Sequence, residues 1–573
     1  MGHLGGVGIC AAIERRHRLA GENQHGWLMV ELHDDLPGLR HLIGISRAED
    51  DKAWDGPQRR HLLDWLVRGP VLPNGDRIVR EDVNDRQLLQ EAAYASVLTR
   101  VRQHTHQRIL QVLETQFPET AATAPELLAH HALRGEQWDQ AVAYFRQAGD
   151  KALTRSAYRE AGAAFEQALI ALQHLPDSRN TCEQAIDLRL ALRTALRPLG
   201  DFRRILAYLR EAETLATTLD DPRRLGWVLV FLSGHFYQRG AHDQAVTAGE
   251  RALALATASG DVVPQALAND RLGLTYRVQG DYRRAIDCFK KTVAALDGGL
   301  RHEGFGQTIL PSVNSHAILA ECYAELGMFA EGRGFGEEGL QIAEAVAHPG
   351  SLMIVYYGLG LLALRQGSLH RGLPLLERAV SICHDADLPG FFPRTASALG
   401  AGYILDGRVA DAMSLLTPAR EQSITMGRAH YETLCSLPLG EAQMLGGCLV
   451  EAQALAGRAL ALARTHQERG NEAYALRLLG AIAAQGDASE RTQAEVHYLQ
   501  ALALAEELGM RPLAAHCQRG LSTLYSQMGR LEQARAVLST AIALYRAMDM
   551  TIWLPQAEAA LAQVGAAPAP RAD

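Results

Sequence analysis

The chain has 573 residues, and its 57 Lys and Arg against 65 Asp and Glu give a formal net charge of −8 at pH 7. This mildly acidic balance argues against a platform for nucleic acid, which needs a basic surface to neutralise phosphates. The 8 cysteines form no Cys-x2-Cys pair, and no apolar run is long enough to span a bilayer. These features favour a soluble cytoplasmic protein that does not enter a membrane.

Residues 1–85 carry none of the periodicity found later in the chain and predict a small mixed module. Residues 61–68 suggest a short helix, and residues 71–79 suggest a hairpin with Asn74-Gly75 in its turn. A helix followed by a small hairpin resembles the end of a winged-helix module, so a DNA-linked regulator is one alternative function. The segment has more acidic than basic residues, which argues against direct DNA binding.

Residues 86–134 predict a helical junction, and they hold the densest histidine groups of the chain, at positions 104, 106, 130 and 131. Metal sites need converging ligands and a supporting second layer of hydrogen bonds. No cysteine or carboxylate with ligand spacing accompanies these histidines, so we expect them to be packing or exposed residues. The sequence shows no catalytic constellation, and we expect no cofactor and no metal.

From residue 135 to residue 560 a degenerate pattern recurs about every forty residues. Its first half is a leucine, a small residue, two variable positions and an aromatic residue or alanine, with a glycine soon after. The starting leucines are separated by 40, 47, 40, 40, 40, 40 and 42 residues and are Leu232, Leu272, Leu319, Leu359, Leu399, Leu439, Leu479 and Leu521. The longer step contains residues 300–306, which we interpret as a surface insertion.

The second half of the pattern is a small residue, an apolar residue four positions later and another small residue three positions after that, as in Ala412, Leu416 and Ala419. This spacing places all three on one face of an α-helix. Small residues let two helix axes approach closely, and the glycine between the halves suits a left-handed helix end. Eleven such second helices can be assigned, so we predict about eleven helical-hairpin units, followed by a disordered tail at 561–573.

The pattern is clearest at 272–289, which reads Leu-Gly-x2-Tyr-x3-Gly-x-Tyr-x2-Ala-x3-Phe and resembles a tetratricopeptide (TPR) repeat. The resemblance implies an all-α fold: a right-handed superhelical solenoid of antiparallel helix pairs, with an unusually long period. No single unit buries its own apolar face, so neighbouring units must stack. Proteins of this kind hold partners and seldom perform chemistry.

Residues 89–168 and 516–563 resemble the corresponding parts of large bacterial signalling proteins. Those proteins join an adenylate or guanylate cyclase domain, or another effector, to a STAND-type (AAA-like) ATPase and a TPR array. The chain lacks their Gly-x4-Gly-Lys-Ser/Thr loop, since the glycine-rich residues 5–8 are followed by no lysine or hydroxyl that could hold phosphate. It therefore resembles their C-terminal half.

In TPR proteins the concave face is lined by first-helix residues that point away from the second helix. The register of the repeats assigns ten residues to this face, many of them Arg or Tyr, which are favoured at binding hot spots. We predict partner binding at Tyr237, Asp270, Arg277, Asn314, Tyr357, Arg365, Arg394, Tyr474, Arg477 and Arg519. Against this prediction, many of these groups could be solvated or paired with glutamates across the groove.

The sequence therefore predicts a non-catalytic TPR scaffold or sensor that binds a protein or peptide on its concave face within a signalling assembly. One alternative is the regulatory half of a cyclase or STAND ATPase whose catalytic part is missing or supplied by another chain. The DNA-linked regulator is the second alternative. The sequence leaves open self-association into a homo-oligomer and the binding of a small molecule in the groove.

Overall fold

The computed structural model describes residues 99–155 and 157–566, and the module predicted for residues 1–85 lies outside them. Contacts divide the chain into two units, Met1–Ile109 and Leu110–Asp573, and the second unit holds the repeats. Its described residues contain α-helices and one short 3-10 helix but no strand, so the predicted all-α fold is confirmed. No helix among them is long and apolar enough to cross a membrane.

The first described helices belong to the predicted junction and to the start of the array. They are α6 (Thr99–Gln116), α7 (Pro118–Thr123), α8 (Pro125–Arg134), α9 (Trp138–Thr154) and α10 (Tyr158–Leu172). Both α9 and α10 carry the second-helix pattern, yet they are consecutive helices that pack against each other. The few residues between Thr154 and Tyr158 leave no room for a separate first helix, so these two segments form one pair.

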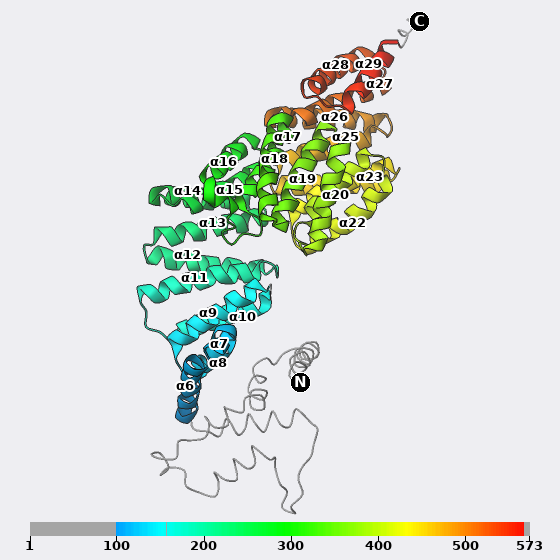
Figure 1. Ribbon diagram of the computed structural model, residues 1–573. Helices are drawn as coiled ribbons and strands as arrows, with labels where there is room; N and C mark the ends of the chain where they lie inside the picture. The colour runs from blue at the N-terminus through cyan, green and yellow to red at the C-terminus, as the bar shows by residue number, and fades with distance from the viewer. Residues whose placement is uncertain (1–98, 156, 567–573) are drawn as a thin grey trace, which may run out of the picture. The chain divides into compact units, whose positions relative to one another are not determined.

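Nine regular antiparallel pairs follow within the described residues (Figure 1). The first four pairs are α11 (Arg179–Leu196) with α12 (Phe202–Thr218), α13 (Pro222–Gln238) with α14 (His242–Ser259), α15 (Val262–Gln279) with α16 (Tyr282–Ala295), and α17 (Pro311–Leu326) with α18 (Phe329–Val346). The other five are α19 (Pro349–Gln366) with α20 (Leu369–Asp385), α21 (Phe392–Leu405) with α22 (Val409–Thr425), α23 (Ala429–Leu445) with α24 (Leu449–Thr465), α25 (Arg469–Ala483) with α26 (Ala488–Leu508), and α27 (Arg511–Gln527) with α28 (Leu531–Ala547).

The array ends with α29 (Trp553–Ala566), which packs on α28. The first six residues of the predicted tail at 561–573 are therefore helical, because the apolar side of this helix covers the last pair. Residues 567–573 lie outside the described part of the chain. The insertion predicted at 300–306 is a 3-10 helix, η1 (Gly298–His302), and a loop that leads to α17.

The small residue after each starting leucine, a glycine in five of the eight repeats, marks the contact between the two helices of a pair. A Cβ at Gly273 of α15 would lie 2.9 Å from the Phe289 ring of α16, and a Cβ at Gly400 of α21 would lie 2.6 Å from Leu416 of α22. The large apolar residue of the second helix thus packs directly on the backbone of the first. This contact explains why the pattern pairs a glycine with a bulky residue sixteen positions later.

The superhelix closes on itself, because helices ten positions apart in the order come into contact. α15 contacts α25 and α17 contacts α27. Figure 1 shows the green α17 next to the orange α25. We call this contact between successive superhelical turns the seam. Two apolar clusters cross it, one joining Leu272 and Phe289 to Leu476 and Leu513, and the other joining Leu362 to residues of α28 and α29.

Candidate functional site

The inner face of the closed turn carries an enclosed network of charged and aromatic side chains. Its members come from α15, α17, α19, α21, α23 and α25, each the first helix of its pair, and from Glu468 immediately before α25. We call it the lumen network; it consists of Arg277, Glu321, Glu325, Tyr357, Arg365, Arg394, His430, Glu441, Glu468, Asn471, Tyr474 and Arg477.

Glu321 of α17 accepts hydrogen bonds from two arginines of different helices. Arg277 of α15 donates at 2.7 Å to one carboxylate oxygen, and Arg394 of α21 donates at 2.5 Å to the other. All three side chains are at least nine-tenths buried, with exposed fractions of 7%, 6% and 5%. Burial alone would raise the pKa of Glu321, but the two guanidinium charges and the hydrogen bond from Arg394 hold it below its ordinary value.

Glu325, one turn further along α17, joins the two superhelical turns. It accepts a hydrogen bond of 2.9 Å from Arg365 of α19 and one of 2.6 Å from the Tyr474 hydroxyl of α25. The Arg365 guanidinium lies over the Tyr474 ring, 4.7 Å from its centre. Burial raises the pKa of Tyr474 well above its ordinary value, and the carboxylate of Glu325 adds to the rise, so the hydroxyl stays a donor.

His430 of α23 connects Arg277 to a third buried carboxylate. Its Nε2 lies 3.4 Å from Arg277, and its Nδ1 lies 3.1 Å from Glu468, which is 1% exposed. Because Arg277 can only donate, these neighbours favour the tautomer with the proton on Nδ1. Asn471 donates to Glu468 at 2.8 Å. Burial lowers the pKa of the nearby His242 to about 4, so that imidazole is neutral at pH 7.

A cavity of about 150 Å³ lies inside the network. Its wall combines Arg277, Arg365 and Arg477 with the carboxylates of Glu321, Glu325 and Glu441 and with apolar residues such as Leu434. Arg477 donates to Glu441 at 3.2 Å. The Nε atoms of Arg277, Arg394 and Arg477 are buried without a hydrogen-bond acceptor among the described residues. An unmet buried donor is costly, so these atoms offer bonds to an entering acceptor.

The structure brings seven of the ten predicted site residues together at the lumen network: five line the cavity, and Tyr237 and Arg394 contact residues that line it. They are Tyr237, whose hydroxyl lies 3.4 Å from Arg277, together with Arg277, Tyr357, Arg365, Arg394, Tyr474 and Arg477. Most are paired with glutamates across the groove. This pairing is the alternative to partner binding that the sequence left open. Whether they contact a partner stays a prediction.

The other three predicted residues lie elsewhere. Asn314 donates at 2.9 Å to Asp270, whose buried carboxyl also accepts from Arg271. Burial raises the pKa of Asp270, although Arg271 and the hydrogen bonds from Asn314 and Ser315 act to lower it. Arg519 of α27 donates to Gln556 at 3.2 Å, at the far end of the array.

The acidic half of the network was not predicted. Glu321 and Glu325 are four residues apart on one first helix, a spacing that puts both carboxylates on the same face. The available sequence signal was this spacing, together with arginines at equivalent positions of the neighbouring repeats. His430 gave no such signal, because its partner Arg277 lies in a different superhelical turn, and Glu468 joins the network through His430.

The buried cysteines of the array are not activated as nucleophiles. Burial raises the pKa of Cys288 to about 11 and those of Cys435 and Cys517 to about 12, so each remains a neutral thiol at pH 7. A thiolate is the reactive form, and it needs a nearby cation and partial exposure. These side chains therefore act as small apolar residues of the core.

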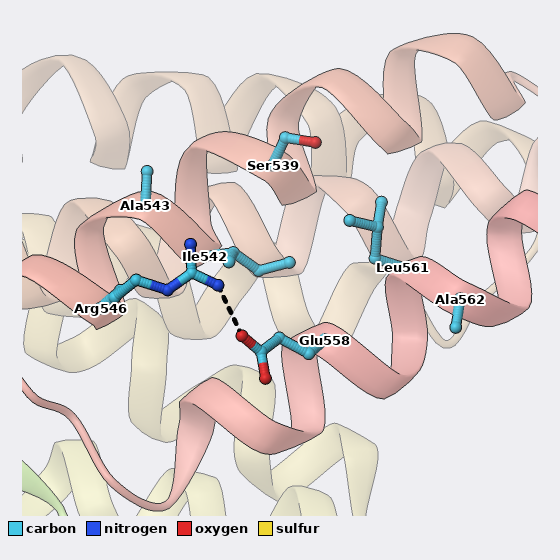
Figure 2. Close-up of a pocket in the computed structure, with 7 residues that line it drawn as sticks. All are labelled: Ser539, Ile542, Ala543, Arg546, Glu558, Leu561 and Ala562. Carbon is cyan, nitrogen blue, oxygen red and sulfur yellow. Dashed lines mark hydrogen bonds and ion pairs between the residues drawn. The ribbon is translucent and has the colours of Figure 1, made fainter.

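A second hollow, of about 490 Å³, opens between α28 and α29 and is lined by residues of both helices (Figure 2). Its polar edge is the ion pair between Arg546 and Glu558, with 2.7 Å between nitrogen and oxygen, and Ile542 and Leu561 form its apolar wall. Both charged side chains are about half exposed or more. Such a pair contributes little binding energy, so this hollow does not compare with the lumen as a site.

Comparison with known proteins agrees with the architecture. The tetratricopeptide repeat family model matches residues 488–547, which cover α26 to the end of α28. No curated protein matches the chain. Together with the helix pairs described above, this match identifies the array as a TPR-like solenoid, as predicted, and no enzymatic family is shown.

Several solved structures are similar at low identity. A Rap protein complexed with competence and sporulation factor is 12% identical, with 68% of this chain and 99% of that chain covered and a TM-score of 0.44. The APC/C hetero-tetramer Cut9-Hcn1 is 14% identical, with 83% and 92% covered and a TM-score of 0.44. A STAND protein with a TPR sensor from Pyrococcus horikoshii is 13% identical, with 67% and 55% covered and a TM-score of 0.39. Likeness at this level says nothing about what this chain binds.

Proposed function

We propose that this chain is a non-catalytic TPR scaffold or sensor that binds a protein or peptide on the concave face of its array. The observation that carries the proposal is the lumen network, a set of buried charges on the inner faces of successive first helices. A concave face built from stacked repeats is the surface that such arrays use for partners. The wall of the lumen offers both hydrogen-bond donors and apolar contacts.

The energetics of the network support recognition over stability. Replacing a buried ion pair by well-packed apolar residues is often neutral or stabilising, by about 1–4 kcal/mol, because desolvation outweighs the attraction between the charges. The helix pairs already have apolar clusters that hold them together. Guanidinium groups whose Nε donors lack acceptors are suited to meet a ligand's carbonyl or carboxylate oxygens.

The size of the cavity sets how a ligand can enter. At about 150 Å³ it is smaller than the roughly 300–1,000 Å³ of typical small-molecule pockets. It accepts one side chain or a chain terminus, and a longer segment enters only when the contact between Glu325 and Tyr474 opens. A ligand that binds the open form better would shift the array toward it, which is how a sensor transmits binding.

The experiment is selection of peptides from a random-sequence display library on the immobilised full chain. Selected peptides should lose roughly tenfold or more in affinity for Arg477→Gln, since a hydrogen bond to a charged group contributes about 1.5–3 kcal/mol. Fluorescence anisotropy of labelled peptides measures the dissociation constants. Arg469→Gln is the matched control, because Arg469 lies on the same helix but pairs outside the cavity with Glu507. Equal affinity for Arg477→Gln and wild type would place binding elsewhere.

We extend the proposal to a signalling assembly in which the array regulates an ATPase or cyclase partner domain in the cytoplasm. The support is the resemblance of residues 89–168 and 516–563 to such proteins. The neighbouring reading frames test this extension. A frame that encodes a phosphate-binding loop would mean that the catalytic part acts from another chain. The DNA-linked alternative depends on residues 1–85, which lie outside the described residues.

A further inference from the structure

Four arginines from three distant parts of the array meet along α13. Arg193 lies over Phe231 and Arg271 lies against Gly234, one turn apart on that helix. Arg428 follows Gly427, whose carbonyl accepts a hydrogen bond from Arg239 at the end of α13. Arg193 and Arg197 lie at the end of α11, Arg271 lies on α15, and Arg428 immediately precedes α23. We call them the arginine cluster. None of them lines the lumen cavity. Binding of a ligand to the arginine cluster is therefore independent of binding in the lumen.

Arg193 is a buried cation without an anionic partner in the described part of the chain. Its side chain is 8% exposed, and its guanidinium carbon lies 4.0 Å above the centre of the Phe231 ring of α13. Across residues 99–155 and 157–566, neither Arg193 nor Arg197 has a hydrogen-bond acceptor or an ion-pair partner for its guanidinium group. The two are four residues apart on one helix face, a spacing at which like charges repel.

The other two arginines, Arg271 and Arg428, have one carboxylate partner between them. Arg271 lies against Gly234 of α13 and donates to Asp270 at 3.0 Å, and Asp270 is already shared with Asn314. Arg428 donates to the carbonyl of Gly390 at 2.7 Å, which leaves its charge unbalanced. The cluster therefore holds four positive charges and one negative charge.

The electrostatics agree with this geometry. Burial lowers the pKa of Arg193 well below its ordinary value, and the charges of Arg197 and Arg271 lower it further. Burial, Arg271 and Arg428 lower the pKa of Arg197 to about 10. The negative end of the α11 dipole favours a cation at this position, but its partial charge cannot balance several guanidinium groups. The missing element is an anion.

We propose that the arginine cluster binds the dianionic phosphoryl group of a ligand. A carboxylate has one charge and two oxygens, which one guanidinium satisfies in a bidentate pair. A phosphate monoester carries about −1.5 to −2 charges at pH 7 and three acceptor oxygens, so it can accept from several arginines at once. Clusters of arginine recognise phosphorylated motifs in this way. The aromatic ring of Phe231 fixes the plane of one guanidinium before the ligand arrives.

The test is isothermal titration of the full chain at constant ionic strength with three probes: inorganic phosphate, a phosphoserine peptide and the same peptide with serine. We expect saturable binding of phosphate or of the phosphopeptide and none of the serine peptide. A phosphopeptide that binds at least tenfold tighter than inorganic phosphate identifies a peptide-borne group, and equal affinities identify free phosphate or a small phosphorylated molecule.

The variants are Arg197→Gln and Arg428→Gln, both of partly exposed residues, with exposed Arg283→Gln of α16 as the matched control. The first two should weaken binding at least tenfold, and the control should bind as wild type does. In chloride, Arg197→Gln should raise the thermal unfolding midpoint, because it relieves repulsion in the empty site. Absence of saturable binding by either phosphorylated probe, or unchanged affinity in both variants, overturns the proposal. A lower midpoint with unchanged affinity also overturns it and makes Arg197 a structural residue of α11.

Discussion

Most side chains of the lumen network are held by partners on other helices, across repeat boundaries. Glu321 illustrates this, because its two oxygens are bound by arginines of two different helices. Neither arginine could be buried without that carboxylate, since an unpaired charge in the interior is expensive. The three groups are therefore interdependent, and removing the central one should affect all of them.

Glu321→Gln keeps the volume of the side chain but removes the charge between Arg277 and Arg394. Breaking a buried pair in this way costs roughly 3–5 kcal/mol, so the variant should unfold at lower urea concentration, as measured by far-UV circular dichroism. The exposed Glu451 on α24 provides the control, and Glu451→Gln should change stability by no more than about 0.5 kcal/mol.

The pH dependence of this difference has a definite sign. The pKa of Glu321 is depressed in the folded protein, so its stabilisation is present above the unfolded value of about 4.5 and is lost as pH falls through the lower folded value. Wild type and Glu321→Gln should therefore converge in acid. A stability gap that persists unchanged below that range would contradict the paired state.

At the scale of the helix, the glycines that end the first helices serve two purposes. Several adopt positive φ, as the sequence predicted, including Gly280, Gly367 and Gly407. Those of the first superhelical turn also touch the second turn: a Cβ at Gly367 would lie 3.0 Å from the Trp553 ring and 3.1 Å from the backbone nitrogen of Ile552. Gly407, one repeat later, faces open space.

Gly367→Ala and Gly407→Ala separate these two roles. Both variants pay the cost of a left-handed alanine, which is about 1–2 kcal/mol. Gly367→Ala should lose additional stability, because the neighbouring ring and backbone cannot both move away. Urea unfolding measures both losses, and equal losses would show that the seam does not constrain Gly367.

At the scale of the whole array, the closed turn changes how stability is distributed. An open solenoid has contacts only between neighbouring repeats and behaves as a one-dimensional chain. Here Tyr474 and Glu325 bond across 149 residues of sequence, and apolar clusters join α15 and α17 to α25 and α27. Helices on opposite sides of the seam should therefore open together.

Tyr474→Phe removes the hydroxyl that crosses the seam and leaves the ring in place. We expect hydrogen exchange, followed by mass spectrometry, to accelerate roughly tenfold or more in both α17 and α25, since the lost bond is to a charged group. Tyr525→Phe is the control, because the Tyr525 hydroxyl bonds to Glu495 of the adjacent helix at 2.9 Å and does not cross the seam. Acceleration confined to α25 in Tyr474→Phe would show that the two sides open independently.

The sequence by itself determined the helix pairs, because the packing of Gly400 on Leu416 and the turn at Gly407 involve residues within one repeat. The same register placed Arg277, Arg365 and Arg394 on the inner face. Only the tertiary structure decided which carboxylates they meet, how small the lumen is, and that Arg193 and Arg428 lie in one cluster. These features depend on superhelical pitch, which sums small rotations over many repeats, and no pattern of forty residues specifies that sum.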